Sequence, residues 1–369
     1  METSKIALIE LGGSHEECLY SQVLFLKKHA FQVHIMLFED HFHRIMAFPE
    51  VDAWKCYKKP PGWLAEWYLV FRLLTYLKRH GIKKAVLNTA EGNIIRKLSR
   101  AAGGFTEFIG IIHQASKLWT SRSQRIINRT VKKYFVLADF IKSNLDQTIT
   151  EIPIACFYPI NFPVEKDQGT GASQDGAKGT EYQICITGAV DFARRDYQSL
   201  LDEMLAAEVP EGVRFILLGR TTSPDGKALI GSIKELGLEK YFTIYDDFIP
   251  HKQFYGILKQ AWLILPLITP RIKNYVRYLR YTVTGSFNLA YGFRVPMLLH
   301  ESFAGDRVIR ETSVFYKDGD LLETVNLCKD HPEMLKTITE RMSDMPEFQF
   351  GLQAEKYIRF IYGNHHSLP

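Results

Sequence analysis

The sequence predicts an α/β protein made of two Rossmann-like domains, each with a parallel sheet. The first observation is length, because 369 residues exceed what one hydrophobic core usually supports. The second is the alternation of short apolar segments with helical segments over almost the whole chain. The third is a single interruption at 163–181, a stretch with four glycines and no large aliphatic residue apart from Val164. We therefore place a flexible linker there.

The first domain is expected to span residues 1–162. Its strands are predicted where short apolar runs occur, at 5–11, 31–38, 85–88, 108–112, 134–137 and 154–157. Helices are expected between them, among them one that ends at residue 30 and two at 64–79 and 121–133. Such a βαβ series implies a parallel sheet with helices on both faces.

The second domain is expected to span residues 182–348. Its strands are predicted at 182–187, 214–218, 241–244, 262–265, 296–299 and 313–316. Its helices are predicted at 197–207, 225–236, 252–259, 286–291 and 320–328. A last helix, at 351–361, has no strand after it. Since ligands bind at the carboxyl ends of strands in open α/β sheets, two such sheets facing across a cleft would hold two substrates.

Composition and charge exclude several classes of protein. The chain has 46 Lys and Arg against 41 Asp and Glu, a net charge of +5 that is too small for a nucleic-acid-binding protein. Five scattered cysteines form no C-x-x-C pair, which excludes a disulfide framework and a cysteine zinc site. The N-terminus lacks the apolar core of a signal peptide, and the most apolar run, 262–268, is too short to span a bilayer. We expect a cytoplasmic protein.

The turn Thr284-Gly285-Ser286, which opens a predicted helix, is the strongest candidate for a phosphate site. The free N–H groups of a helix N-terminus and two hydroxyls suit a diphosphate, and Gly285 lets a ligand approach the backbone. The alternative is an ordinary N-cap. Four basic residues precede the turn, with no acidic residue among them: Arg271, Lys273, Arg277 and Arg280. They either bind phosphate or form a solvated helix face.

A second candidate follows the strand at 182–187. The strand ends at Gly188, and Arg194 and Arg195 come before the next helix. At the carboxyl edge of a sheet, the two arginines could neutralise charge on a departing phosphate. The alternative is a surface loop with ordinary charges.

In the first domain, polar residues follow three strands. Gly12-Gly13 is neither a dinucleotide-binding G-x-G-x-x-G nor part of a P-loop, so it either lets a substrate lie against the backbone or forms a tight turn. His113 ends one strand, and Asn88 and Glu91 end the preceding one. A histidine there binds sugar hydroxyls or acts as an acid or base, unless it is structural.

Two segments bear on membrane contact. The aromatic residues between 54 and 76 are expected to pack in the core. The other segment contains five basic residues: Arg122, Arg125, Arg129, Lys132 and Lys133. If they lie on one helix, they fall on an arc of about 100°. That basic stripe would face either anionic lipid or solvent.

The order of segments resembles a GT-B glycosyltransferase, closest to the retaining family 4 group, over nearly the whole chain. The segments that carry the resemblance are Gly12-Gly13, 136–145, 157–163, Leu217-Leu-Gly219-Arg220, Phe248-Ile-Pro-His251 and Gly292-Phe-Arg-Val-Pro296. Arg194-Arg195 falls where the family carries a lysine and a glycine near the donor phosphates.

The resemblance implies that the second domain binds a UDP- or GDP-sugar and the first an acceptor, a glycan or a lipid-linked sugar, with segment 349–369 returning to the first domain. It also implies a metal-independent hexosyl or related transfer without a cofactor, in surface polysaccharide synthesis at the inner face of the membrane. The expected catalytic residues are Arg194, Arg195 and His113. The expected donor ligands are Gly188, Gly219, Phe248, Arg280, Thr284, Gly285, Ser286 and Asn288. The expected acceptor ligands are Gly12, Gly13, Asn88 and Glu91.

One feature departs from the family pattern. Family 4 members carry two glutamates around the phosphate-binding turn, and those positions here are Leu279 and Phe287. This leaves two alternatives open. One is a catalytically silent GT-B-like subunit that binds a glycan or a partner, and the other is a sugar-nucleotide epimerase.

Overall fold

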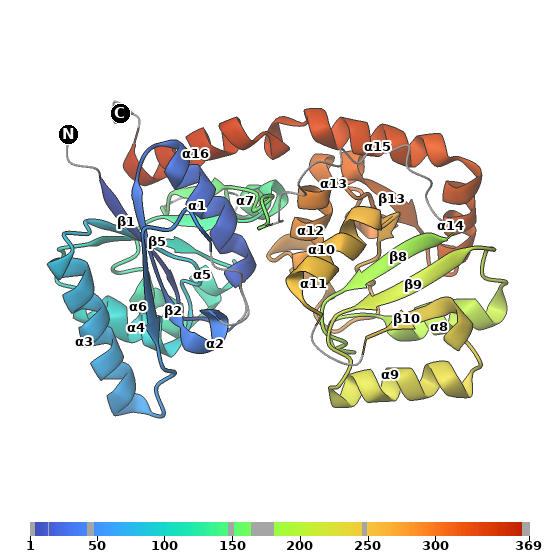
Figure 1. Ribbon diagram of the computed structural model, residues 1–369, viewed down its shortest axis with the longest axis horizontal. Coiled ribbons are helices and arrows are strands. Elements are labelled where there is room, and N and C mark those ends of the chain that lie inside the picture. Colours follow the sequence, from blue (N-terminus) through green and yellow to red (C-terminus); the bar gives the residue numbers. More distant parts are fainter. Residues whose placement is uncertain are drawn as a thin grey trace. The chain divides into compact units, whose positions relative to one another are not determined.

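The computed structural model describes residues 4–13, 15–42, 48–146, 151–163, 181–245 and 249–363. These residues form two compact units, coloured along the chain in Figure 1. The N-terminal unit contains the described residues up to Pro163, together with Arg280–Thr282 and those from Gln349 onward. The C-terminal unit contains the described residues between Glu181 and Leu279 and between Val283 and Phe348.

The N-terminal unit is built on a parallel sheet of seven strands in the order β3-β2-β1-β4-β5-β6-β7. Its strands are β1 (Lys5–Glu10), β2 (Gln32–Phe38), β3 (Ala53–Tyr57), β4 (Lys84–Leu87), β5 (Glu107–Ile111), β6 (Tyr134–Val136) and β7 (Ile154–Cys156). The central strand β1 pairs with β2 and β4, and its residues Ile6 to Ile9 are fully buried. A strand buried on both faces reads as a continuous apolar run, which is why the sequence revealed it.

Helices cover both faces of this sheet. They are α1 (Leu19–Lys28), α2 (Glu39–Phe42), α3 (Trp63–Arg79), α4 (Gly92–Ala101), α5 (Lys117–Thr120), α6 (Arg122–Ile127), α7 (Asp139–Asp146) and α16 (Phe350–Tyr362). On one face α1 packs on α16, and on the other α4 packs on α3 and α6 (Figure 1). The last helix is held by Tyr357, whose ring stacks on Phe135 at 4.7 Å and whose hydroxyl donates to Gln22 at 2.8 Å.

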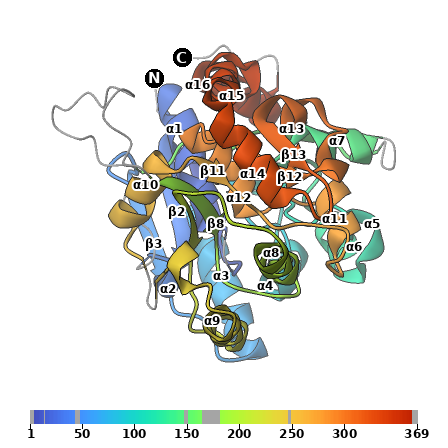
Figure 2. The ribbon, with the colours of Figure 1, turned by 90° about the vertical axis from the view of Figure 1, so that its right-hand side faces the viewer.

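The C-terminal unit has a parallel sheet of six strands in the order β10-β9-β8-β11-β12-β13. The strands are β8 (Tyr182–Thr187), β9 (Val213–Leu218), β10 (Phe242–Ile244), β11 (Leu263–Ile264), β12 (Met297–His300) and β13 (Ser313–Tyr316). The helices are α8 (Tyr197–Ala206), α9 (Pro224–Glu235), α10 (His251–Gln260), α11 (Tyr275–Arg280), α12 (Gly285–Phe293), α13 (Arg307–Thr312), α14 (Leu321–Asp330) and α15 (Pro332–Asp344). On one face α10 packs on α12, and on the other α14 packs on α8 (Figure 2).

The predicted parallel α/β architecture is confirmed in both units, with differences in detail. Strand β3 and the helices α11, α13 and α15 were not predicted. The prediction of one helix over 121–133 is wrong, because α6 ends at Ile127. There the Asn128 side chain accepts from the hydroxyl of Tyr134 at 2.7 Å, so the chain turns into β6. The basic residues at 122–133 therefore do not share one helix face.

The expectation that the aromatic residues between 54 and 76 pack in the core also needs correction. Tyr57 is buried, but Trp63, Tyr68 and Phe71 are exposed on α3. The reason is that α3 buries a different row of side chains, which contains Leu69, Leu73 and Leu77. Most of the predicted linker, 164–180, and the predicted donor ligand Phe248 lie outside the described residues.

Candidate functional site

Two glycines bring the ends of β8 and β9 together at the carboxyl edge of the C-terminal sheet. Gly188 follows β8 with a φ of +98°, a conformation that glycine adopts without strain. Gly219 follows β9, and a Cβ on it would overlap the backbone carbonyl of Gly188. The Gly188 N–H donates to the carbonyl of Leu218 at 2.9 Å. Both predicted glycines therefore lie where a ligand of an α/β sheet is expected.

The two predicted arginines of the loop after β8 differ in their contacts. The guanidinium of Arg195 donates to the carbonyls of Thr187 and, at 2.9 Å, Pro266, so it ties the ends of β8 and β11 together. Burial lowers the pKa of Arg195. Arg194 is exposed and its Nε donates to the hydroxyl of Tyr278 at 3.1 Å. Arg194 is thus the arginine of this loop that is free to meet an anion.

The N-terminus of α12 carries polar atoms that lack partners. Thr284 is the N-cap, yet its side chain makes no capping hydrogen bond. Its Oγ1 and the Oδ1 of Asn288 are buried without a hydrogen-bond partner, on residues that are 6% and 2% exposed. Buried polar atoms in native proteins are nearly always paired, so each unpaired one calls for an explanation.

The same turn is anchored to the sheet. The Oγ1 of Thr187, the last residue of β8, donates to the Oγ of Ser286 at 2.8 Å. Gly285 is exposed, and a Cβ on it would meet nothing within 4 Å. The first N–H groups of a helix have no partner within the helix, and they attract anions. The predicted turn is therefore an open helix N-terminus fixed beside the Gly188 loop.

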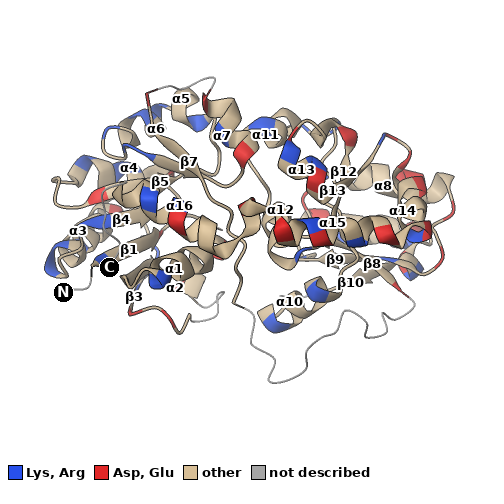
Figure 3. Cartoon of the chain, turned by 90° about the horizontal axis from the view of Figure 1, so that it is seen from above, with Lys and Arg blue, Asp and Glu red and all other residues tan. Residues whose placement is uncertain are grey.

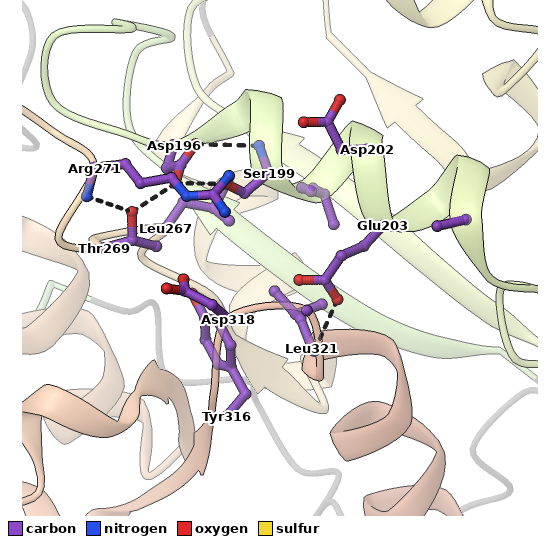
Figure 4. A pocket seen from close by; sticks show the side chains of 13 residues that line it. Asp196, Ser199, Asp202, Glu203, Leu267, Thr269, Arg271, Tyr316, Asp318 and Leu321 are labelled. Atoms are coloured by element: carbon purple, nitrogen blue, oxygen red, sulfur yellow. Dashed lines mark hydrogen bonds between the residues drawn. The ribbon is translucent and has the colours of Figure 1, made fainter.

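The basic residues before this turn are dispersed. Arg271 lines a pocket of about 260 Å³ next to α8, where its Nη1 donates to Ser199 at 2.9 Å (Figure 4). In the same pocket Asp196 accepts from Ser199 and Thr269. Arg280 is the exposed last residue of α11 and is grouped with the N-terminal unit. The structure does not bring Arg271 to the α12 turn.

At the carboxyl edge of the N-terminal sheet, a buried carboxylate organises the predicted residues. Glu10, the last residue of β1, accepts from the Gly12 N–H at 2.6 Å, from Thr89 Oγ1 at 2.8 Å and from Asn88 Nδ2. Burial raises the pKa of Glu10. A Cβ on Gly12 would lie 2.7 Å from Glu10 Oε1 and from Thr89, whereas one on Gly13 would meet nothing. The Gly12 N–H is therefore occupied, and Gly13 is the accessible glycine.

Asn88 and Glu91 also make internal contacts. Asn88 is fully buried, accepts from Gln22 Nε2 at 2.6 Å and donates to the carbonyl of His15 at 2.7 Å. Glu91 accepts from the backbone N–H of His113 at 3.1 Å and pairs with Lys117. Both residues fix the loops around the edge.

Two histidines meet at this edge. The rings of His15 and His113 stack in parallel with their centroids 3.5 Å apart, and His113 Nε2 lies 2.7 Å from the carbonyl of Asn88. Burial, and next the neighbouring His15, lower the pKa of His113 well below its usual value. Burial alone would lower the pKa of His15, but the carboxylates of Glu17, Glu10 and Glu91 together outweigh burial and raise it. Of the two stacked rings, His15 therefore has the higher pKa.

Four residues of these edges were not predicted as site residues. Glu10 and Thr187 are the last residues of β1 and β8, so a polar residue that closes an apolar run is the signal that would have found them. His15 follows the predicted Gly12-Gly13 turn. Tyr278 left no such signal, since its contact with Arg194 spans 84 positions of the chain.

No family model matches the sequence, and no curated protein matches it either. Solved structures do match. Alr3699/HepE from Anabaena, solved with UDP and glucose, is 13% identical with a TM-score of 0.67, over 97% of this chain and 99% of that one. Sucrose-phosphate synthase from Thermosynechococcus elongatus is 12% identical with a TM-score of 0.67, over 97% and 98%. The chain has the GT-B fold.

The same fold also occurs in sugar-nucleotide epimerases. UDP-GlcNAc 2-epimerase from Methanocaldococcus jannaschii is 13% identical with a TM-score of 0.58, over 96% of this chain and 99% of that one. At these identities the comparisons establish the fold and leave the family 4 subtype a prediction. The Phe287 position, where family 4 places a glutamate, holds a buried ring that packs against Tyr291 and Phe303.

None of the described helices combines the length and the apolar composition needed to cross a bilayer. No group of three or more His, Cys, Asp or Glu side chains in the described part of the chain is arranged to hold a metal ion.

Proposed function

We propose that this protein is a glycosyltransferase that moves a sugar from a nucleoside-diphosphate sugar to a glycan or lipid-linked acceptor. One observation carries the proposal: the α12 N-terminus has unpartnered polar atoms on Thr284 and Asn288 next to the open Gly285. A threonine hydroxyl donates to a phosphate oxygen, and an amide oxygen accepts from a sugar hydroxyl. A sugar diphosphate therefore offers complementary partners to both.

The structural comparisons support the same class of donor. HepE was solved with UDP and with UDP-glucose, and its fold matches over nearly the whole chain. We propose a UDP-sugar as the donor. The alternative donor is a GDP-sugar, which carries guanine in place of uracil. In this proposal Asn288 accepts from the hydroxyl groups that a glutamate binds in family 4. We also propose that the transfer retains the configuration at the anomeric carbon of the donor sugar.

Within the C-terminal unit, the residues take different roles in this proposal. Arg194 neutralises charge on the departing nucleoside diphosphate, together with the helix N-terminus at Ser286. Arg195 positions the loop through its bonds to two backbone carbonyls. Gly188 and Gly219 allow the close approach of the two strand ends. Since an arginine and a helix N-terminus hold the phosphate charge, we propose a transfer that needs no metal.

Within the N-terminal unit, we propose that the acceptor binds at the carboxyl edge of the sheet. Gly13 leaves space for it, and the neutral His113 contacts its hydroxyl groups. Gly12, Asn88 and Glu91 act by positioning these loops. We propose a hexosyl or related transfer in surface polysaccharide synthesis on the cytoplasmic side of a membrane.

Calorimetry with UDP and GDP tests the donor site. Gly285→Asp adds a carboxylate at the open helix N-terminus and should weaken binding at least about tenfold, because it occupies the anion site with like charge. Gly305→Asp is the matched control, since Gly305 is also exposed and a Cβ there meets nothing within 4 Å. Undiminished binding by folded Gly285→Asp would overturn the assignment.

Turnover separates the alternatives. A transferase releases nucleoside diphosphate only when an acceptor is consumed. Conversion of the donor to its epimer without an acceptor would assign the chain to the epimerases, as the Methanocaldococcus match would suggest. Tight nucleotide binding without either reaction would identify a silent subunit.

A further inference from the structure

Helix α3 exposes apolar side chains along its outer face. Trp63, Leu64, Tyr68 and Phe71 are 66%, 66%, 65% and 67% exposed. No other described helix carries more than two exposed large hydrophobic residues. Isolated exposed apolar residues are ordinary, but a contiguous set marks an interaction surface.

The spacing makes these residues contiguous. Leu64, Tyr68 and Phe71 stand at positions i, i+4 and i+7, so they form one row along the helix. The opposite row, which contains Leu69 and Leu73, is buried in the N-terminal unit. The helix therefore has two apolar faces, and in the described part of the chain only one of them is covered.

Basic residues surround the exposed row. Five of them are exposed, on α3 or just before it: Lys58, Lys59, Arg72, Lys78 and Arg79. The guanidinium of Arg72 lies over the Tyr68 ring at 5.7 Å. The one acidic residue of α3, Glu66, is paired with Lys97 at 2.7 Å. Figure 3 shows the Lys and Arg residues of α3 and of the adjacent α4 in blue.

We propose that this α3 face, meaning Trp63, Leu64, Tyr68 and Phe71 with their five basic neighbours, docks the protein on an anionic lipid bilayer. Trp and Tyr side chains favour the boundary between headgroups and acyl chains. An apolar row flanked by Lys and Arg is the pattern of a helix that lies in the plane of that boundary. Anionic headgroups supply the charge that the five cations lack.

Charge argues against a second copy of the chain as the occupant. A two-fold interface would place the same patch on both subunits and bring the basic margins of the two copies close together. An anionic surface removes that repulsion. This inference does not depend on sugar transfer, since vesicle binding requires neither donor nor acceptor.

Co-sedimentation of the full chain with vesicles tests the inference. Wild type should bind vesicles of phosphatidylcholine and phosphatidylglycerol more tightly than vesicles of phosphatidylcholine alone. The double variant Lys58→Glu/Lys59→Glu should lose at least about tenfold, because each basic residue near an anionic surface contributes about fivefold. The double variant Leu64→Ser/Phe71→Ser should lose a similar factor and remain folded, because both side chains are exposed.

The matched control is Leu327→Ser/Leu352→Ser, which removes exposed leucines from α14 and α16 and should bind like wild type. Equal sedimentation of wild type with neutral and anionic vesicles would overturn the proposal. So would wild-type binding by Leu64→Ser/Phe71→Ser. A dimer in solution that this variant abolishes, without vesicle binding by wild type, would assign the α3 face to a second copy and also overturn it.

Discussion

The carboxyl edges of the two sheets are built in opposite ways. In the N-terminal unit, the buried polar groups satisfy one another, as Glu10, Asn88 and Gln22 do. In the C-terminal unit, Thr284 and Asn288 are also buried, but each keeps an oxygen without a partner. Buried polar groups are costly when unpaired, and in the cluster around Glu10 these groups pair with one another. At the second edge, the oxygens of Thr284 and Asn288 gain partners only when a ligand binds.

The two buried asparagines give the sharpest test of this difference. Asn88→Ala removes three hydrogen bonds and leaves Glu10 and Gln22 with lost partners, so it should lower the free energy of unfolding by about 3 kcal/mol. Asn288→Ala removes an oxygen that had no partner, so it should change stability by less than about 1 kcal/mol while weakening UDP binding. Urea denaturation measures both variants. Equal losses would show that the two edges do not differ.

The next largest effect concerns the arginines of the C-terminal edge. Arg194→Ala should reduce turnover about a hundredfold, because a lost charge-assisted contact in the transition state is worth about 3 kcal/mol. Arg220→Ala is the control, since Arg220 is also exposed and follows Gly219 at the end of β9. Transfer should also survive EDTA. If the Arg194 variant turns over at the wild-type rate, or if chelation abolishes transfer, the leaving group is stabilised by other groups.

The smallest effect is a pH dependence of the N-terminal edge. Because the pKa of His113 is lowered in the folded state, the unfolded chain binds the proton first, and stability is lost as the pH falls below about 6.5. The loss is at most about 1.4 kcal/mol per pH unit. The raised pKa of His15 acts in the opposite direction, since its stabilisation is present at low pH and is lost as the pH rises through its folded value.

The variant His113→Gln isolates the first effect. Between pH 7.5 and 5.5, wild type should lose stability relative to this variant by about 1 kcal/mol in urea denaturation. His331→Gln, which removes an exposed histidine at the start of α15, should follow wild type. Parallel profiles for wild type and His113→Gln would contradict the assignment of a neutral His113.

The sequence by itself determined the architecture. Buried parallel strands read as apolar runs, and residues 5–11 and 182–187 were recognised for that reason. It also placed glycines at the ends of β8 and β9, because glycines after apolar runs mark strand ends. These are local signals, carried by residues a few positions apart.

The tertiary structure alone decided which polar side chains are already occupied. The contacts of Asn88 with Glu10 and Gln22 span 78 and 66 positions, and the contact of Thr187 with Ser286 spans 99. It also decided that Tyr68 and Phe71 face outward, because the sequence of α3 offers two apolar rows and only packing on α4 chooses between them. A local pattern fixes which side chains share a helix face or a strand end. Which of these side chains stay unpaired or exposed depends on residues that are distant in the sequence. A local pattern carries no information about those residues.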